Sequence, residues 1–437
     1  MSPLSPDPPR RRIFRGATRM AGWLSAAAAV AVFCPGLGAQ GEWPQFRGPR
    51  GDGHAEARGI PRAWSEEKNV RWKTAIHGRG WSSPVLWGRQ IWMTTATPDG
   101  KELFAVCVDR ESGRVVHDVK VFEVENPPAI NPLNSYASPT PVLEEGRVWV
   151  HFGSMGTACL DTGSGKVLWA RRDLPCDHYR GPGSSPFLWK DLLILHFDGY
   201  DFQYVAALDK STGRTVWKRD RGIDYGTDDG DFKKAFCTPI AIEVAGRTQL
   251  ISPGSRAAMA YDPRTGEEIW RVRFPSFSST GRPLHGRGLV YINTGFGKAD
   301  LIAVRPDGRG DVTNTHVVWT AREGIGSKPS AVLVDDLIYV VTDVGGIISA
   351  IEADTGKTVW RKRAAGGQHS ASPVYADGAV FFFDHDGLAV AIKPGREYVE
   401  LARNRLEDGC MASPAAVGRE WYIRTRTHLY RVEEGVK

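Results

Sequence analysis

Two basic side chains stand where the surrounding pattern has a hydroxyl, and they are the first candidates for binding chemistry. Ser or Thr precedes the proline that opens six apolar runs, whereas Arg282 and Lys328 precede Pro283 and Pro329. Cations that converge at one end of a fold can hold a carboxylate or a phosphate group. Ordinary solvated surface charge is the interpretation that we favour, and an anion-binding site is the alternative. Its predicted members are Arg180, Lys234, Arg282, Lys328 and His369.

An acidic segment offers an internal explanation for the same cations. Asp228, Asp229 and Asp231 lie in one long polar segment. Two cations held a few ångströms apart repel each other, and an acidic side chain or a bound anion would relieve that repulsion. If these aspartates neutralise Arg282 and Lys328, the two cations are structural. If the cations face an open cavity without partners, they form a ligand site.

The sequence predicts no catalytic group and no metal site. Residues 198–201, 228–231 and 384–387 resemble the start of a calcium-binding loop, but none is followed by the bidentate Glu of an EF-hand. There is no Cys-x-x-Cys pair, and no spacing singles out a Ser/His/Asp or glycosidase constellation. Five of the six cysteines follow residue 39, and this odd number argues against a complete disulfide framework.

A repeated unit must position the candidate cations. The stretch from Ala207 to Trp217 is typical of a strand end, a tight turn at Asp209 and Gly213, and a second strand. The same pattern spans residues 159–169, 260–270 and 350–360, always with ten positions from its first residue to its tryptophan. A spacing that persists through otherwise different sequence marks a structural repeat.

The strand-opening prolines give the length of the repeat. Eight of them follow one another at intervals of 41 to 55 residues, and each interval holds four short strand patterns. Proline is confined to the start of the first strand, where a missing N–H does least harm. The chain is therefore predicted to be all-β, as an eight-bladed β-propeller of four-stranded antiparallel blades.

The two ends of the repeat region are complementary. Residues 69–74 form a lone outer strand with a tryptophan, whereas residues 413–432 supply three strands and no outer one. We predict that the N-terminal strand completes the C-terminal blade, since such a closure removes exposed sheet edges.

The tryptophans of the repeat are predicted to be structural. Each ring is expected to pack between neighbouring blades, near a small residue of a repeat. His117 takes the tryptophan position in the first repeat, and we interpret it as a tolerated substitution. The predicted docking residues are Trp72, Trp169, Trp217, Trp270, Trp319 and Trp360.

The repeat Ala-x-Asp-x-x-Thr-Gly-x-x-x-Trp resembles the tryptophan-docking repeat of pyrroloquinoline-quinone-type (PQQ-like) propellers. The segment from Trp43 to Gly48, Trp-Pro-Gln-Phe-Arg-Gly, is also similar to the start of many uncharacterised bacterial PQQ-like propellers. Together these matches cover about residues 43–433. The resemblance implies a fold that hosts several unrelated activities.

Two classes of function follow from this resemblance. One is a non-catalytic binding or assembly propeller, like the propeller lipoprotein of the outer-membrane barrel-assembly machinery. The other is a quinoprotein dehydrogenase that uses PQQ and calcium. The chain has no adjacent Cys-Cys pair, which the alcohol dehydrogenases of the family place over the quinone, and no Cys-x-x-Cys-His haem site. We favour a scaffold that binds a protein or an envelope component through its loop face and uses no cofactor.

The N-terminus predicts export. Residues 21–33 are mostly apolar, follow five arginines and precede a Leu-Gly-Ala cleavage pattern. We therefore assign residues 1–39 to a signal peptide, residues 40–68 to a lead-in and residues 69–437 to the propeller. Arg11 and Arg12 resemble a twin-arginine signal, whereas Phe33 before Cys34 argues against a lipid anchor.

Charge and composition bear on the partners. Four of the six net positive charges lie in residues 1–39, so the remaining chain gives little reason to expect a nucleic-acid partner. The expected product is a periplasmic or secreted monomer with no transmembrane helix after cleavage.

Overall fold

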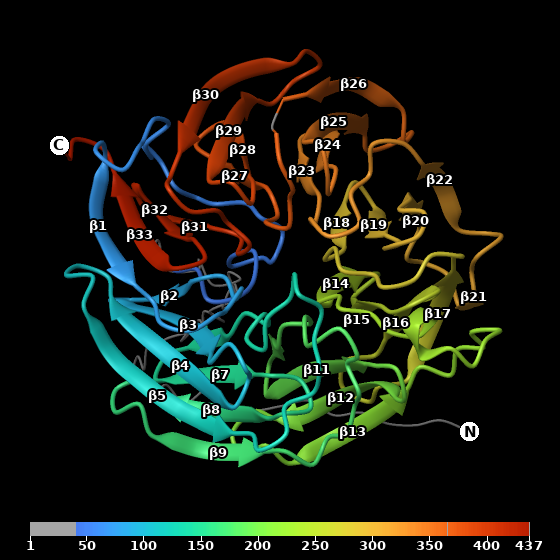
Figure 1. The fold of residues 1–437 in the computed structure, drawn as a ribbon. Coiled ribbons are helices and arrows are strands. Elements are labelled where there is room, and N and C mark those ends of the chain that lie inside the picture. Colours follow the sequence, from blue (N-terminus) through green and yellow to red (C-terminus); the bar gives the residue numbers. More distant parts are fainter. Residues whose placement is uncertain (1–40, 365, 437) are drawn as a thin grey trace, which may run out of the picture. The chain divides into compact units, whose positions relative to one another are not determined.

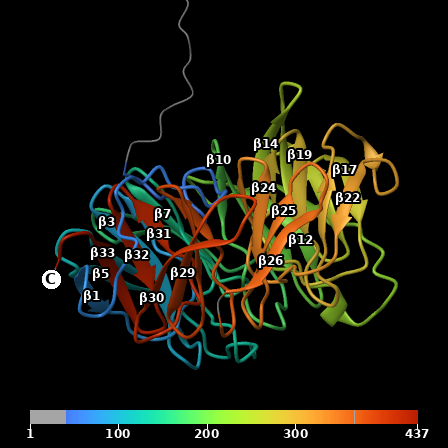
Figure 2. The same cartoon turned by 90° about the horizontal axis from the view of Figure 1, so that it is seen from above.

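Strands account for almost all of the regular structure of this chain. The computed structural model describes residues 41–364 and 366–436, so the predicted signal peptide lies outside the described residues. The strands form eight sheets arranged around one axis (Figure 1). Figure 2 shows the same strands after a turn of 90°. The predicted eight-bladed propeller is confirmed.

Blades 1 to 4 follow one another along the chain, and each runs from an inner to an outer strand. Their strands are β2 (Val85–Trp87), β3 (Gln90–Ala96), β4 (Glu102–Asp109) and β5 (Val115–Glu123); β6 (Val142–Glu144), β7 (Arg147–His151), β8 (Thr157–Asp161) and β9 (Val167–Arg171); β10 (Phe187–Trp189), β11 (Leu192–Asp198), β12 (Gln203–Asp209) and β13 (Thr215–Asp220); and β14 (Ile240–Val244), β15 (Arg247–Pro253), β16 (Ala257–Tyr261) and β17 (Glu268–Arg273). A short 3-10 helix, η1 (Gly230–Phe232), lies between blades 3 and 4.

Blades 5 to 8 repeat this order. Their strands are β18 (Leu284–Gly286), β19 (Leu289–Asn293), β20 (Leu301–Val304) and β22 (Val317–Ala321); β23 (Val332–Val334), β24 (Leu337–Val341), β25 (Ile347–Glu352) and β26 (Thr358–Arg363); β27 (Val374–Ala376), β28 (Ala379–Phe383), β29 (Leu388–Lys393) and β30 (Val399–Arg405); and β31 (Ala415–Val417), β32 (Glu420–Arg424) and β33 (His428–Glu433) with β1 (Val70–Ala75). The insertion before Trp319 forms β21 (Gly310–Asp311), which pairs in parallel with β17 and gives blade 4 a fifth strand.

The ring closes through its N-terminal strand. β1 pairs antiparallel with β33, with Val70 opposite Val432 and Ala75 opposite His428. Figure 1 shows the first strand, in blue, beside the last, in red. The predicted closure is confirmed, and it leaves the last blade with the same four strands as its neighbours.

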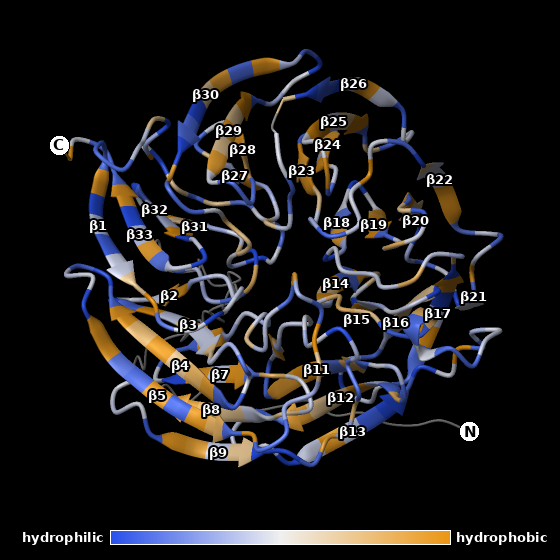
Figure 3. Cartoon of the chain, in the orientation of Figure 1, coloured by the Kyte–Doolittle hydropathy of each residue, from blue (hydrophilic) through white to orange (hydrophobic). Residues whose placement is uncertain are grey.

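Burial follows the position of a strand in its blade. Every residue of β11 is buried, because this second strand is covered by sheets on both faces. The outer strand β1 instead alternates between half-buried and exposed residues. Figure 3 shows the outer strands β1, β5 and β30 with hydrophilic and hydrophobic residues in alternation. The core of the propeller is therefore a series of apolar layers between neighbouring blades.

The repeated turn is held by its aspartate. The Asp209 carboxylate accepts hydrogen bonds from the Ser211 and Thr212 amides at 3.0 and 2.9 Å. Gly213 has a φ of 73°, in the left-handed region that favours glycine. This geometry explains why Asp and Gly recur at a fixed spacing.

Five of the six tryptophans of the repeat reach the turn of the next blade. The Trp169 indole N–H donates to the carbonyl of Lys210 at 3.0 Å, and its ring covers Gly213, where a Cβ would lie 2.7 Å from the indole. Equivalent indole bonds run from Trp72 to Arg110, from Trp217 to Pro263, from Trp319 to Ala353 and from Trp360 to Gly395. Trp270 is fully buried but donates within its own blade, to Gln249. Glycine in the turn therefore makes room for the ring.

His117 lies at the corresponding place in blade 1. Its ring stacks on Trp92 at 5.5 Å between ring centroids and borders Gly165 of the next blade. A smaller aromatic ring thus fills the interblade position where the other repeats have tryptophan.

Trp217→Ala is expected to lower the free energy of unfolding by about 2–3 kcal/mol. Full burial of an aromatic ring would make the loss about 3–5 kcal/mol, but Trp217 is only half-buried. Urea unfolding of both proteins measures the difference. Val216→Ala is the matched control, because Val216 is exposed on the same strand. A loss below about 1 kcal/mol for Trp217→Ala would show that the interblade contact contributes little.

Candidate functional site

The connections of each blade reach two different rims. Tight turns join the first strand to the second and the third to the fourth, and they form the turn rim. Longer connections join the second strand to the third and the fourth to the next blade, and they form the loop rim. Because every blade has the same order, the long loops gather on one rim, apart from residues 305–316 of blade 5, which lie on the turn rim and contain β21.

The lead-in closes the axis on the turn rim. Residues 43–55, here called the plug, cross from blade 1 to blade 7. Trp43 exchanges two backbone hydrogen bonds with Leu86 of β2, and the Pro44 carbonyl accepts from Leu143 of β6. The Ala55 amide donates to the carbonyl of Tyr375 in β27 of blade 7. The plug therefore seals one end of the axial space.

Arg282 holds the plug in place through hydrogen bonds. Its guanidinium is buried and donates to the carbonyls of Pro239, at 3.1 Å, and Phe46. It also donates to the Gln45 side-chain oxygen at 3.2 Å. Burial lowers the pKa of Arg282 to about 10. The side chain thus faces the plug and forms no ion pair with the residues that the structure describes.

Arg47 is the plug's own buried cation. Its guanidinium donates to the carbonyls of Ala331 at 2.5 Å and Asp52 at 2.7 Å. Burial lowers the pKa of Arg47 to about 9, and the nearby charge of Arg282 acts in the same direction. Carbonyl dipoles, rather than a carboxylate in ion-pair contact, stabilise both arginines.

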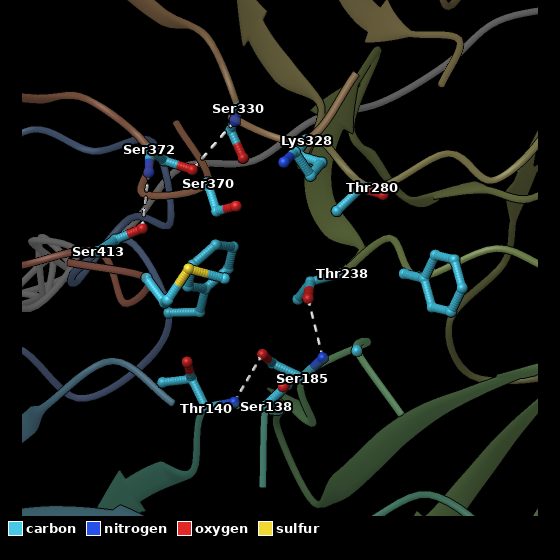
Figure 4. Close-up of a pocket in the computed structure, with 14 residues that line it drawn as sticks. Ser138, Thr140, Ser185, Thr238, Thr280, Lys328, Ser330, Ser370, Ser372 and Ser413 are labelled. Atoms are coloured by element: carbon cyan, nitrogen blue, oxygen red, sulfur yellow. Dashed lines mark hydrogen bonds between the residues drawn. The ribbon is translucent and has the colours of Figure 1, made fainter. Parts of the chain in front are cut away.

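Above the plug lies a small axial cavity, whose lining residues are shown in Figure 4. Its volume is about 100 Å³, and Phe46 of the plug is part of its wall. The other lining side chains come from the segments that open the blades: Ser138, Thr140, Ser185, Phe236, Thr238, Thr280, Lys328, Ser330, Ser370, Ser372, Met411 and Ser413. Lys328 is the only charged side chain among the residues that line it.

A ring of hydroxyl groups surrounds this axis. The backbone amide of each member donates to the hydroxyl oxygen of the next at 2.9–3.1 Å: Ser83 to Thr140, Thr140 to Ser185, Ser185 to Thr238, Ser330 to Ser372, Ser372 to Ser413 and Ser413 to Ser83. Arg282 interrupts the series, although its own amide donates to Ser330 at 2.9 Å. These seven side chains, here called the hydroxyl ring, connect neighbouring blades around the axis.

In two blades the ring residue follows the strand-opening proline instead of preceding it. In blade 2 the ring member is Thr140, two residues after Ser138. In blade 6 it is Ser330, two residues after Lys328. Lys328 therefore precedes the ring residue of its blade and does not itself occupy a ring position. Arg282 alone takes the place of a hydroxyl.

Lys328 is half-buried at the cavity (Figure 4). Its amide donates to Asp343 at 2.9 Å, and the same carboxylate accepts from the Ser327 amide at 2.8 Å. No ion pair to the Lys328 ammonium is formed within residues 41–364 and 366–436. Burial lowers the pKa of Lys328, and the Asp343 charge opposes this effect.

Arg180 and Lys234 lie together, away from Arg282. Asp231 contacts both of them, at 2.5 Å from the Lys234 nitrogen and 3.4 Å from that of Arg180. Thus one of the three predicted aspartates does meet cations, but they are not Arg282 and Lys328. His369 is fully buried, and both of its ring nitrogens face backbone carbonyls, of Phe383 at 3.0 Å and Gly366 at 3.2 Å.

The calcium-like loops use their carboxylates internally. Asp198 forms a buried two-bond ion pair with Arg221, at 2.6 and 2.8 Å. Asp201 accepts from the amides of Asp177 and Phe202, both at 2.7 Å. In the described part of the chain, no group of three or more His, Cys, Asp or Glu side chains is placed to hold a metal ion.

Exposed apolar side chains gather on the loop rim. Six large ones lie outside the strands, all of them in loops of this rim: Leu133, Tyr179, Tyr200, Phe202, Phe296 and Val344. None of the described connections on the turn rim carries one. Sequence reasoning missed this set, because only the topology shows that these loops share a rim.

Three members of this set and two half-buried phenylalanines form an aromatic patch, here defined as Tyr179, Tyr200, Phe232, Phe277 and Phe296. The ring centroids of Tyr179 and Tyr200 are 5.1 Å apart, and those of Phe277 and Phe296 are 5.6 Å apart. Lys234 links the two pairs, with its nitrogen 6.0 Å from the Tyr179 centroid and 5.4 Å from that of Phe277. The Arg180 guanidinium lies 4.4 Å from the Tyr179 centroid. Two of the five predicted site residues therefore belong to the patch rather than to the axial cavity.

Comparison with solved structures shows that the chain is similar to several known β-propellers. The BamB structure from Moraxella catarrhalis is similar with a TM-score of 0.59 and 13% identity, over 83% of this chain and 99% of that one. Quinohemoprotein alcohol dehydrogenase from Comamonas testosteroni gives 0.67 and 12%, over 91% and 81%. A europium-containing methanol dehydrogenase gives 0.64 and 13%, over 88% and 89%. At these identities the likeness shows the fold and no shared activity.

Comparison of the sequence with family models identifies the family of the chain. No curated protein matches the chain. No helix among the described residues is long and apolar enough to cross a membrane. The family model described as "Outer membrane protein assembly factor BamB" matches residues 201–434, which is more than half of the 437 residues. The resemblance to PQQ-like propellers is thereby confirmed, and the chain belongs to the family of outer membrane protein assembly factor BamB.

Proposed function

We propose that this protein is a non-catalytic scaffold of the cell envelope that binds a protein partner on its loop rim. The observation that carries the proposal is the one-sided placement of exposed apolar side chains. Phe296 and Phe202 are 59% and 47% exposed, although aromatic rings of this size usually bury most of their surface. Contiguous exposed apolar surface beside polar groups is typical of a protein interaction site.

The aromatic patch has the composition of an interface centre. Tyrosine, phenylalanine and arginine are enriched among the residues that contribute most to protein binding. Arg180 and Lys234 stiffen the patch through their contacts with Tyr179 and Asp231. Rings that are already held in place lose little conformational entropy on binding, so more of the contact energy contributes to the binding free energy.

The axial cavity fits the alternative function poorly. A PQQ-dependent dehydrogenase must hold a flat three-ring quinone, and typical sites for small molecules have volumes of roughly 300–1,000 Å³. The axial cavity has about 100 Å³ and is closed by the plug. Its lining offers no carboxylate for a calcium ion, so we derive no redox step for this chain.

Envelope location rests on the name of the family and on the predicted signal peptide. A BamB-type assembly factor acts at the outer membrane by the description of its family. We extend that location to this chain, with the loop rim as the face offered to the partner.

A photo-crosslinking amino acid at Phe202 or Phe296 tests the proposal in cells that produce the full chain. We expect both positions to give the same discrete crosslinked product, because both side chains are exposed on the loop rim. Leu168 and Val318 are the matched controls, since they are equally apolar and exposed but lie on outer strands. Equal crosslinking at all four positions, or none at any, would contradict the proposal.

Double substitution of Tyr179→Ser and Phe296→Ser gives the quantitative form of the test. The crosslinked product formed at Phe202 should fall about tenfold or more, while the melting temperature stays near that of the wild type. For the alternative function, purified protein is titrated with PQQ and calcium. A saturable bound-quinone absorption band together with dye-linked alcohol oxidation would favour the dehydrogenase.

A further inference from the structure

We propose that the axial cavity is a binding site for one small oxyanion, a carboxylate or a phosphate group. This inference goes beyond the scaffold function, because it concerns the axis of the ring and not the aromatic patch. It rests on the direction in which the lining groups donate hydrogen bonds, on the charges around the axis and on the size of the cavity.

The hydroxyl ring presents donors to the axis. A Ser or Thr hydroxyl has one proton to donate and two lone pairs that accept. In each of the seven members the oxygen already accepts a backbone N–H from the neighbouring blade. None of these hydroxyls donates to any acceptor in the described part of the chain. Their protons therefore remain free for a ligand.

Burial makes these free protons significant. All seven ring residues are at least 95% buried, with Ser413 the most exposed at 5%. A buried polar group without a partner is costly, so the free donors favour a ligand that accepts several hydrogen bonds. Ser185, Thr238, Ser330, Ser372 and Ser413 face the cavity from different sides in Figure 4. Convergent donors of this kind match the oxygen atoms of an anion.

The charged side chains near the axis also favour an anion, because they are positive. Lys328 lines the cavity, and Arg282 and Arg47 lie on the side of the plug. None of these three forms an ion pair within residues 41–364 and 366–436. In a site that is largely shielded from water, such cations attract an anion more strongly than they would at an open surface.

The size of the cavity limits the ligand to a small group. About 100 Å³ is well below the usual volume of a cofactor pocket, but it leaves room for one carboxylate or phosphate. The plug occupies the turn-rim side of the axis, so the loop rim is the side left for entry. The group is therefore either a free ion or the acidic end of a larger molecule that enters from that rim.

Isothermal titration of the full chain at constant ionic strength tests the site. The probes are inorganic phosphate, acetate, and a short peptide with either a free or an amidated C-terminus. We expect one saturable site for at least one of the oxyanions. Tighter binding of the free-carboxylate peptide than of acetate, with no binding of its amide, would identify a larger molecule as the source. Equal binding of acetate and the peptide would identify a free ion.

Two variants locate the site. Lys328→Met should weaken binding about tenfold or more, because it removes a charged donor and keeps a similar length. Lys298→Met is the matched control, since Lys298 is an exposed lysine on the same rim, and it should bind as the wild type does. Ser372→Ala should also weaken binding without changing the net charge, and its melting curve shows whether the ring still folds.

Three results would overturn the proposal. One is the absence of saturable heat for every oxyanion with the wild type. Another is equal affinity of the wild type and Lys328→Met. The third is a loss of binding in Lys298→Met as large as that in Lys328→Met, since it would show general screening of the rim charge.

Discussion

Deletion of residues 41–75 is expected to convert the propeller into a protein that aggregates. The deletion removes β1 and leaves the outer edge of β33 without a partner. An unpaired sheet edge offers free N–H and C=O groups to other chains. The deletion also removes Trp64, which packs against Phe381, Phe383 and Trp421 in the core of blades 7 and 8.

Size-exclusion chromatography and thermal unfolding by circular dichroism measure this effect. Deletion of residues 43–54 alone is the control, because it removes most of the plug but keeps β1. This shorter deletion should leave a soluble ring with a lower melting temperature. A monomeric product of the longer deletion with a single cooperative transition would show that closure by β1 is dispensable.

Asp198→Ala is expected to lower the free energy of unfolding by about 3–5 kcal/mol. Asp198 and Arg221 are both 1% exposed, and their two hydrogen bonds lie deep between blades 3 and 4. Burial alone would lower the pKa of Arg221, but the Asp198 carboxylate outweighs burial and holds that pKa above its usual value. Without Asp198, a buried cation remains with only Ser252 as a partner.

Denaturant unfolding with two comparison proteins separates the causes. Asp173→Ala breaks a surface ion pair with Arg171, in which Asp173 is 68% exposed, and should cost at most about 1 kcal/mol. The double variant Asp198→Val with Arg221→Met removes both charges and should recover much of the lost stability. If Asp198→Ala costs no more than Asp173→Ala, the buried pair does not stabilise the fold.

The repeat could be read from the sequence because one local structure recurs. Asp209 and Gly213 fix a turn through their own backbone preferences, and the same pair of residues recurs in other blades. The closing strand could be found by counting strands at the two ends. These features depend on short segments, so residues that are neighbours in sequence are enough to predict them.

The register at the axis could not be read in the same way. In blade 6, Lys328 and Ser330 are two residues apart, on either side of Pro329, and both are polar. Only the amide of Arg282, from another blade, selects Ser330 as the ring member. The role of Arg282 could not be predicted either, because its hydrogen-bond partners Phe46 and Gln45 lie more than 230 residues away in sequence. Contacts between distant segments have no local pattern that identifies them.

The pairing of β1 with β33 has a consequence for the order in which the chain folds. Residues 70–75 leave the ribosome before every other strand of the propeller, whereas their partners lie in the strand of the ring that is made last. The earliest strand must therefore wait, unpaired, until seven blades have been synthesised. Such long-range pairing makes folding slow and prolongs the time during which an incomplete chain can associate with others. For this protein, the step that commits the chain to its native state can occur only after synthesis of the last blade.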